Sequence, residues 1–297
     1  MELNGQEVRF RGGPIRVAYM DGEGYQFLDN PEAAIEMLRK SRTRADVFTF
    51  IQRLSESEPK FSYPREFDNF AALPVSTYDH WMAKQIDFKT RNKVRKAAKN
   101  GVVTQEVPYD DTFVQGISRI YNECPVRQGM QFWHYGKDIE TVRQINGTFP
   151  DRSIYIGAFH EGMMIGFVKL VTDEQRGQAG LMQILSMIQY RDKAPTNALV
   201  AQAVRSCAER GIPYLWYAKI TYGKKGEDSL AEFKRHNGFQ KLEVPRYYVP
   251  LTMIGRIAVR FGLHRSLLEW VPAPMTATYR KIRGFWYARK LPHLKNA

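Results

Sequence analysis

One segment of the sequence, residues 181–211, constrains the fold of this chain more than any other. It opens with eight mostly apolar residues, and a run of this length rich in Ile, Leu and Met is typical of a strand buried on both faces. A polar turn follows, after which apolar residues recur at intervals of three and four until Gly211, as in a helix with a glycine stop. We expect Thr196 or Asn197 to cap this helix. The segment is therefore predicted to fold as strand, turn and helix.

The turn of this unit, residues 189–195, is a candidate anion-binding site. A strand that leads directly into a helix leaves unpaired backbone N–H groups, which stabilise a phosphate, a carboxylate or a developing oxyanion. We expect the N–H groups of residues 188–190 to act in this way, and we take Tyr190, Arg191 and Asn197 as candidate substrate-binding residues. Many strand-turn-helix units bind nothing and only contribute to the packed core, so a binding site and a purely structural role both stay open.

The elements around this unit predict a mixed sheet. Residues 154–159 and 163–172 are predicted to pair as antiparallel strands that continue into the central strand. Residues 214–219 are expected to lie parallel to the central strand, through a right-handed crossover. A short helix follows over residues 229–237, and residues 239–251 are predicted to form a terminal hairpin around Pro245.

The first ninety residues are predicted to mix short strands and helices. Asn30-Pro31 is a good helix start, and residues 70–75 are predicted as a strand. Residues 88–101 then place six cations on one helix with a narrow apolar stripe. A solvated basic face is one interpretation, and phosphate contact or docking between two halves is the other, because like charges this close repel. Under the second interpretation Arg91 and Arg95 are candidate substrate-binding residues.

A long loop, residues 125–137, combines aromatic, basic and histidine side chains. Loops of this kind on a rigid scaffold often line binding sites, although the aromatic residues would equally serve to cover a core. On the first interpretation His134 is a candidate general base. Arg127, Trp133 and Tyr135 are then candidate substrate-binding residues.

Composition limits the class of protein and its partners. The 297 residues favour two domains, and 44 Lys and Arg against 31 Asp and Glu give a net charge of +13, which favours an anionic partner. The two cysteines do not form a disulfide framework, so we expect no disulfide partner and a cytoplasmic location. None of the six histidines has a metal-binding spacing, so we expect no metal. We also expect no secretory signal and no spanning helix.

The C-terminal residues 255–291 are predicted to form two amphipathic helices. From residue 256 to the end the sequence has nine Lys or Arg and one acid, so much of the excess charge is local to this tail. Packing of the tail on the core is one interpretation. The other is peripheral association with an anionic membrane surface, which for a cytoplasmic protein is the inner face.

The predicted order of elements resembles the GNAT acyltransferase fold from residue 102 to residue 251. The segments that carry this resemblance are Ile165-Gly166-Phe167 and Asn237-Gly238-Phe239. Two further segments are similar to the FemAB-like branch, which contains the peptidoglycan-bridge aminoacyltransferases: RNKVRKAAKNGV at residues 91–102 and LAEFK at residues 230–234. The resemblance implies an α+β fold, with a GNAT-like mixed sheet and flanking helices in two GNAT-like halves.

The same resemblance implies a division of the chain and a class of reaction. Residues 1–101 would be a reduced N-terminal half ending in the basic helix, residues 102–252 a complete GNAT-like domain, and residues 253–297 a basic helical tail. The implied function is N-acyl transfer from acyl-CoA or aminoacyl-tRNA to an amine of a sugar, peptide or cell-envelope precursor. The alternative is a non-catalytic protein of this fold that binds membrane or nucleic acid.

The resemblance also implies site residues. Lys234 stands where many acetyltransferases have a tyrosine general acid, so Lys234 is expected to balance negative charge beside the cleft. Tyr217 and Tyr222 are expected either to donate a proton or to line the cleft, and Lys219 to make its rim basic. The sequence departs from the CoA-binding pattern "[QR]-x-x-G-x-[GA]", because the turn has no glycine and contains Pro195, which lacks an N–H donor.

Overall fold

The computed structural model describes residues 2–3, 6–56, 58–127, 130–220 and 229–265. Within these residues eleven strands form one sheet, and a separate two-stranded hairpin pairs β7 (Val126–Arg127) with β8 (Met130–Gln131). The strands of the large sheet follow one another in space as β1 (Glu2–Leu3), β2 (Gln6–Arg11), β3 (Val17–Met20), β4 (Val47–Ile51), β13 (Gln240–Pro250), β5 (Arg65–Pro74), β12 (Tyr214–Lys219), β11 (Ala179–Ser186), β10 (Met163–Thr172), β9 (Ser153–His160) and β6 (Val103–Glu106).

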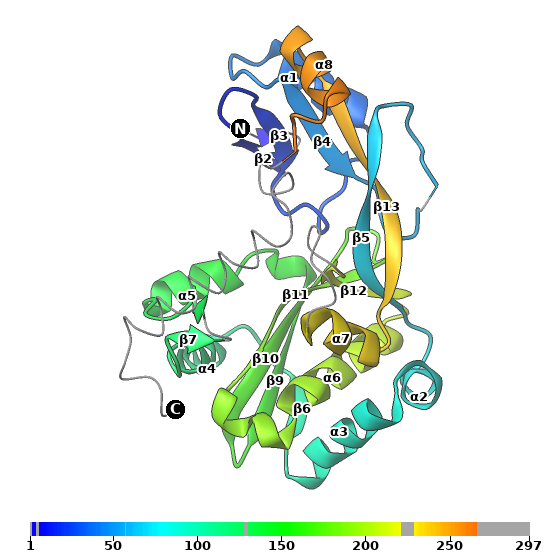
Figure 1. The fold of residues 1–297 in the computed structure, drawn as a ribbon. Helices are drawn as coiled ribbons and strands as arrows, with labels where there is room; N and C mark the ends of the chain where they lie inside the picture. Colours follow the sequence, from blue (N-terminus) through cyan, green and yellow to red (C-terminus); the bar gives the residue numbers. More distant parts are fainter. Residues whose placement is uncertain (1, 4–5, 57, 128–129, 221–228, 266–297) are drawn as a thin grey trace.

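Two long strands, β5 and β13, join the two lobes of the molecule (Figure 1). The first part of β13 pairs with β5, from Gln240 opposite Ala72 to Tyr247 opposite Arg65, and its last part pairs with β4. The predicted hairpin around Pro245 is therefore wrong. Proline lacks an N–H, but the carbonyl group of Pro245 still accepts a hydrogen bond from the Gln52 N–H, and the strand continues straight through it.

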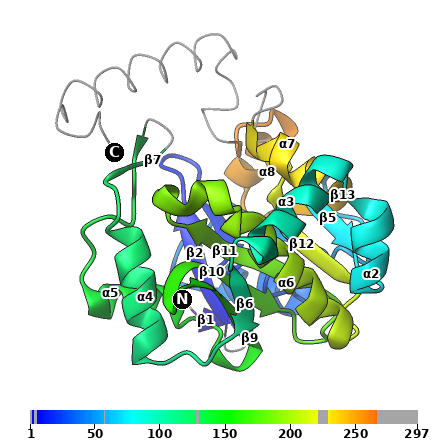
Figure 2. The same cartoon turned by 90° about the horizontal axis from the view of Figure 1, so that it is seen from below.

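The lobe that contains β6 and β9–β12 has helices on both faces of its sheet (Figure 2). One face packs against α6 (Pro195–Glu209), which in turn contacts α3 (Phe88–Lys99). The other face packs against α4 (Asp111–Tyr121) and α5 (Ile139–Asn146). A fifth helix, α7 (Ser229–His236), precedes β13. This arrangement confirms the predicted antiparallel order of β9, β10 and β11 and the parallel pairing of β12 with β11.

The other lobe is smaller and also has a helix on each face. α1 (Pro31–Lys40) begins at Asn30, whose side chain accepts a hydrogen bond from the Ala33 N–H, as the sequence predicts. α8 (Met253–Arg260) packs on the opposite face through Ala258. Three short elements link longer ones: α2 (Tyr78–His80) and the π-helix η1 (Trp81–Gln85) lie between β5 and α3, and the 3₁₀ turn η2 (Pro150–Arg152) lies between α5 and β9.

The start of the central helix differs from the prediction. A 3₁₀ turn, η3 (Ile188–Lys193), follows β11, and α6 begins directly after it at Pro195. The residue in the cap position is Ala194, in the left-handed conformation, and no side chain caps the helix. Thr196 and Asn197 therefore lie inside the first turn. The predicted glycine stop is confirmed, since Gly211 has φ of 64°.

Candidate functional site

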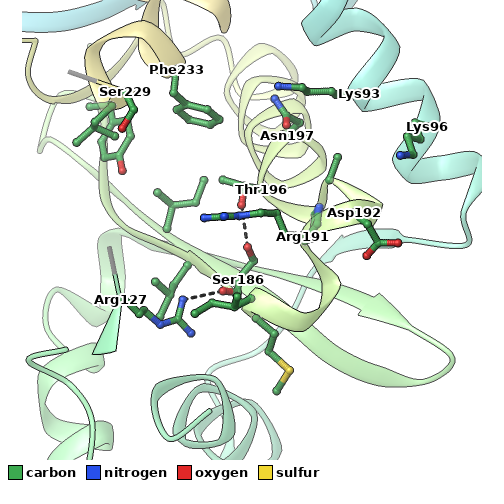
Figure 3. Close-up of a pocket in the computed structure, with 18 residues that line it drawn as sticks. Lys93, Lys96, Arg127, Ser186, Arg191, Asp192, Thr196, Asn197, Ser229 and Phe233 are labelled. Atoms are coloured by element: carbon green, nitrogen blue, oxygen red, sulfur yellow. Dashed lines mark hydrogen bonds between the residues drawn. The ribbon is translucent and has the colours of Figure 1, made fainter. Parts of the chain in front are cut away.

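The candidate site is an opening between the two parallel strands β11 and β12. They pair at only two positions, Ala179 with Leu215 and Gly180 with Trp216, and separate beyond them. A pocket of about 600 Å³ occupies the opening (Figure 3). Its walls come from the end of β11, from η3, and from the facing parts of α3, α6, α7 and β12. Its polar lining side chains are Lys93, Lys96, Arg127, Ser186, Arg191, Asp192, Thr196, Asn197, Tyr217 and Ser229.

Two alanines with an unusual backbone flank this pocket. Ala194 has φ of 54° at the start of α6, and Ala218 has φ of 47° near the end of β12. At Ala218 the pairing of β12 with β5 also shifts register, between Trp216 and Lys219. A left-handed conformation costs a non-glycine residue about 1–3 kcal/mol, and such residues concentrate at functional sites. The strain therefore supports a functional role for this opening.

The pocket is strongly basic. Four cations, Lys93, Lys96, Arg127 and Arg191, line it together with one carboxylate, Asp192. Arg127 pairs with a carboxylate outside the lining, but Lys93, Lys96 and Arg191 form no ion pair in the described part of the chain. Uncompensated positive charge in a concave site raises the local concentration of anions. The pocket is therefore suited to a ligand that carries phosphate or carboxylate.

The backbone N–H groups predicted to hold an oxyanion are already occupied. The carboxylate of Glu123 accepts hydrogen bonds from the N–H of Ile188 at 2.8 Å and the N–H of Gln189 at 3.0 Å. Arg127 connects this carboxylate, at 2.8 Å, to the carbonyl oxygen of Ser186 at the end of β11, also at 2.8 Å. The prediction for these two N–H groups is therefore wrong, because an internal carboxylate takes the place of the external anion.

Side chains provide donors where the backbone does not. The hydroxyl oxygens of Ser186 and Thr196 lie 2.8 Å apart. Because one hydroxyl donates to the other, the second keeps its proton for a ligand. Asn197 is buried, and its amide donates to the side-chain oxygen of Asn237 at 3.4 Å, which fixes its orientation. Figure 3 shows Thr196, Asn197 and Arg191 on the same side of the pocket.

Two of the predicted catalytic residues lie together at this site. Tyr217 lines the pocket, and the Nζ atom of Lys234 lies 4.4 Å from the centre of the Tyr217 ring. Lys234 is fully buried and donates to the carbonyl oxygen of Lys219 at 2.7 Å. Its ammonium group is thus fixed directly behind the tyrosine, where a cation interacts favourably with the ring face. Tyr222, the third predicted residue, lies outside the described residues.

Lys219 joins a partly buried network of ion pairs and does not line the pocket. Its Nζ donates to Asp68 at 2.6 Å, and Asp68 also accepts from Arg246 at 2.6 Å. Arg246 in turn donates to both carboxylate oxygens of Glu23, at 2.7 and 2.8 Å. These neighbours hold the pKa of Asp68 below its usual value against the effect of burial. The charge of Lys219 is therefore balanced inside the protein.

The residues predicted in the 125–137 loop separate into two groups. Arg127 reaches the pocket, whereas His134 stacks on Tyr121, with ring centres 4.3 Å apart, on the opposite face of the sheet. Burial and the nearby Lys137 lower the pKa of His134. Trp133 is 78% exposed, and Tyr135 is also exposed. His134, Trp133 and Tyr135 do not line the pocket.

Of the predicted residues on α3, on η3 and at the start of α6, some line the pocket and others do not. Arg91 donates to the carbonyl oxygens of Met82, Ala83 and Ile86, and so closes the end of the π-helix. Arg95 is exposed and does not line the pocket. Tyr190 packs against the core with its ring edge towards His160. Arg191 and Asn197 lie in the pocket as predicted.

Sequence reasoning missed several site residues. Lys93 and Lys96 belong to the basic helix that the sequence predicts, but which side of this helix, α3, faces the pocket depends on tertiary packing. Thr196 was considered only as a cap, and Ser186 only as part of a strand. Glu123 had a weak signal, its spacing of four residues from Arg127.

The chain matches no protein-family model and no curated protein sequence. It is similar in structure to FemX, with a TM-score of 0.58 and 12% identity over 85% of this chain and 86% of that chain. The L-PGS protein of Bacillus licheniformis gives a TM-score of 0.55 at 13% identity, over 85% of this chain and 84% of that one.

A further structural neighbour is the C-terminal domain (DUF2156) of a protein from Agrobacterium fabrum, assigned as a lysylphosphatidylglycerol synthetase. The TM-score is 0.55 at 11% identity, over 85% of this chain and 83% of that domain. At these identities the likeness concerns the fold. The expected α+β fold, a mixed sheet with flanking helices, is confirmed, and it is similar to the fold of FemX.

Proposed function

We propose that this protein is an N-acyltransferase that moves an acyl or aminoacyl group to an amine of a sugar, peptide or cell-envelope precursor. The observation that carries the proposal is the basic pocket at the separation of β11 and β12, with Tyr217 and the buried Lys234 at its wall. The fold shared with FemX and L-PGS supports the same class of chemistry.

The pocket contains the groups that such a transfer needs. The acceptor amine attacks the carbonyl carbon of the donor, and the new C–N bond forms while the carbonyl oxygen becomes negative. The free hydroxyl proton of the Ser186–Thr196 pair stabilises that oxygen, an effect worth about 10²–10³ in rate for one well-placed donor. The bond to the leaving group then breaks, and Tyr217 beside Lys234 gives the leaving atom a proton, which the amine proton replaces.

The pocket favours an aminoacyl-tRNA ester over acyl-CoA as the donor. A CoA pyrophosphate would need free backbone N–H groups in the turn before α6, but Glu123 occupies two of them and Pro195 has none. The lysines Lys93 and Lys96 instead offer side-chain contacts for the phosphates of a nucleic acid. With a tRNA ester, the leaving group is the ribose oxygen of the terminal nucleotide.

We place this reaction in the cytoplasm, where charged tRNA is available and where two cysteines would stay reduced. No helix in the described part of the chain is long and apolar enough to cross a membrane. The described residues also contain no cluster that would hold a metal ion, and the proposed reaction uses none.

The test is transfer measured with defined donors. The full chain is mixed with aminoacyl-tRNA or with acetyl-CoA and a panel of amino sugars and peptidoglycan-stem peptides, and amide products are detected by mass spectrometry. We expect products from the tRNA donor. Ser186→Ala combined with Thr196→Val, which removes both hydroxyls of the pair, should lower kcat about 10²-fold, and Lys234→Met should abolish turnover in a protein that remains folded.

The matched control for the pocket lysines is on the same helix. Lys93→Gln with Lys96→Gln should raise KM for the donor, whereas Lys99→Gln, which lies outside the pocket, should leave it unchanged. The rival function is non-catalytic binding of nucleic acid through α3, which the unpaired lysines of that helix favour. Binding of tRNA without product from any donor, unaffected by Thr196→Val, would replace the transferase proposal by this rival.

A further inference from the structure

α8 presents a stripe of large apolar side chains to the solvent. Met253 and Ile257 on the helix and Phe261 at its C-cap follow one another at intervals of four residues; Ile254 is on the same helix, and Leu263 follows two residues after the cap. These five side chains are between 47 and 66% exposed. Isolated exposed apolar residues are ordinary, but a contiguous stripe marks an interaction surface.

The stripe is held outward by close packing on the other side of the helix. A Cβ atom at Gly255 would lie 1.8 Å from the carbonyl oxygen of Asp46, so only glycine allows this approach. Thr252 caps the helix through the Gly255 N–H and also donates to Asp46 at 2.8 Å. Ala258 is fully buried. With this face fixed against the sheet, α8 cannot turn its apolar side chains inward.

Arginines line one edge of the stripe. Arg256 and Arg260 are exposed, one helical turn apart, and neither pairs with a carboxylate among the residues that the structure describes. The sequence that follows, residues 266–297, contains six Lys or Arg, one acid and five aromatic residues. The surface therefore combines apolar area with uncompensated positive charge, which an anionic and partly apolar partner would complement.

The positive charge beside the stripe argues against two other partners that could cover it. The chain's own C-terminal segment is basic, so covering the stripe with it would bring like charges together. A second copy in a symmetric contact would oppose Arg256 and Arg260 with the same arginines. An exposed convex helix, rather than a groove, is also the geometry that lies on a bilayer surface.

We infer that α8 is a docking surface for an anionic lipid bilayer. Met253, Ile257 and Phe261 enter the boundary between headgroups and acyl chains, and Arg256 and Arg260 contact lipid phosphates. α8 lies at the end of the molecule opposite to α3 (Figure 1), so a bilayer bound there leaves the pocket in the aqueous phase. The inference is independent of the transferase proposal, because it uses none of the pocket residues.

The test is sedimentation of the full chain with vesicles, comparing phosphatidylcholine alone with phosphatidylcholine mixed with phosphatidylglycerol. We expect binding only to the mixed vesicles. Arg256→Gln with Arg260→Gln should weaken it about fivefold for each arginine removed. Ile257→Ser with Phe261→Ser should weaken it roughly tenfold or more, and both side chains are exposed enough for the fold to tolerate the change.

Matched controls on α3 separate this surface from general charge attraction. Lys89→Gln with Lys99→Gln also removes two exposed cations, and Phe88→Ser removes an apolar side chain that is 69% exposed. Both controls should bind vesicles as the unaltered protein does. Equal losses in the α3 and α8 variants, or no binding of the unaltered protein to mixed vesicles, would overturn the inference. An unchanged vesicle affinity of the α8 variants together with altered self-association would assign the stripe to a second copy.

Discussion

At the scale of single residues, Lys169 on β10 carries a clear energetic cost. It is 1% exposed, and its Nζ donates to the hydroxyl oxygen of Thr148 at 2.7 Å while lying near the rings of Phe149 and Tyr155. Burial lowers the pKa of Lys169 from 10.5 to about 7. The charged form is therefore disfavoured in the folded protein relative to the unfolded chain.

This shift predicts how Lys169→Met changes the stability. Between pH 7 and pH 10.5 the unfolded chain binds a proton that the folded protein does not, so the stability of the unaltered protein rises with pH, by about 1.4 kcal/mol per pH unit at most. Below pH 7 Lys169 is charged in both states, so the full free-energy cost of burying its charge lowers the stability of the folded protein. Lys169→Met should therefore stabilise the protein most at pH 6, with a gain that shrinks towards pH 10.

Denaturant unfolding at several pH values measures this difference. Lys99→Met, which removes one positive charge from the exposed side of α3, is the control for a change in net charge. A gain for Lys169→Met that is the same at pH 6 and pH 10 would contradict the assigned cause.

At the scale of elements, the turn η3 is stabilised by a side chain that comes from a distant loop. Glu123 fills the position of an anion at the N–H groups of Ile188 and Gln189, and Arg127 links it to the end of β11. The turn therefore keeps its shape without a bound ligand. This explains how a turn without glycine can sit between the central strand and the central helix.

Glu123→Ala should both weaken the fold and create an anion site. Losing charge-assisted hydrogen bonds in a partly buried position should lower the free energy of unfolding by about 1.5–3 kcal/mol. Added pyrophosphate should restore part of this loss in the variant, because the two N–H groups are then free. Thermal unfolding with and without pyrophosphate measures both effects, and the exposed Glu140→Ala is the control. A variant that pyrophosphate does not stabilise would show that the turn collapses when the carboxylate is removed.

The elements also show what the sequence can predict. Periodicity and turn residues were sufficient for β9 to β12, α6 and the basic helix α3, because each of these segments carries its own apolar pattern with a turn or a glycine at its end. They failed at β13, since a proline between two apolar segments looks like a hairpin unless β4 and β5 are known to pair with both segments. The site shows the same limit. Arg191, Asn197, Tyr217 and Arg127 line the pocket, but the sequence favours Arg91 over Lys93, because only tertiary packing determines which side of α3 faces the pocket.

At the scale of the whole molecule, the two lobes share one sheet. β13 lies between β4 and β5, and the partly buried network of Glu23, Arg246, Asp68 and Lys219 crosses the same boundary. Burial alone would lower the pKa of Arg246, but the carboxylates of Glu23 and Asp68 raise it above its ordinary value, so this charge stays in place at any ordinary pH. The boundary predicted from the sequence at residue 101 thus divides a continuous sheet, whereas the boundary at residue 252 falls between the last strand, β13, and α8.

This continuity predicts the behaviour of severed chains. A fragment of residues 1–101 contains β4 and β5 but lacks β13 between them, so it should show no cooperative unfolding transition alone. Mixed with a fragment of residues 102–297, it should regain a single transition like that of the intact protein. Circular dichroism during thermal unfolding measures both outcomes. A cooperative transition in the isolated 1–101 fragment would show that this half folds independently.

The long strand β13 also limits how the protein can admit its ligands. Hinged enzymes open by rotating one lobe against the other about a few flexible residues. Here such a rotation would have to break the ladder of hydrogen bonds that β13 makes on both sides. Besides α6 and the turn η3, the walls of the pocket that come from helices are parts of α3 and α7, so access for a ligand depends on how these helices pack against the sheet and not on a swivel between lobes.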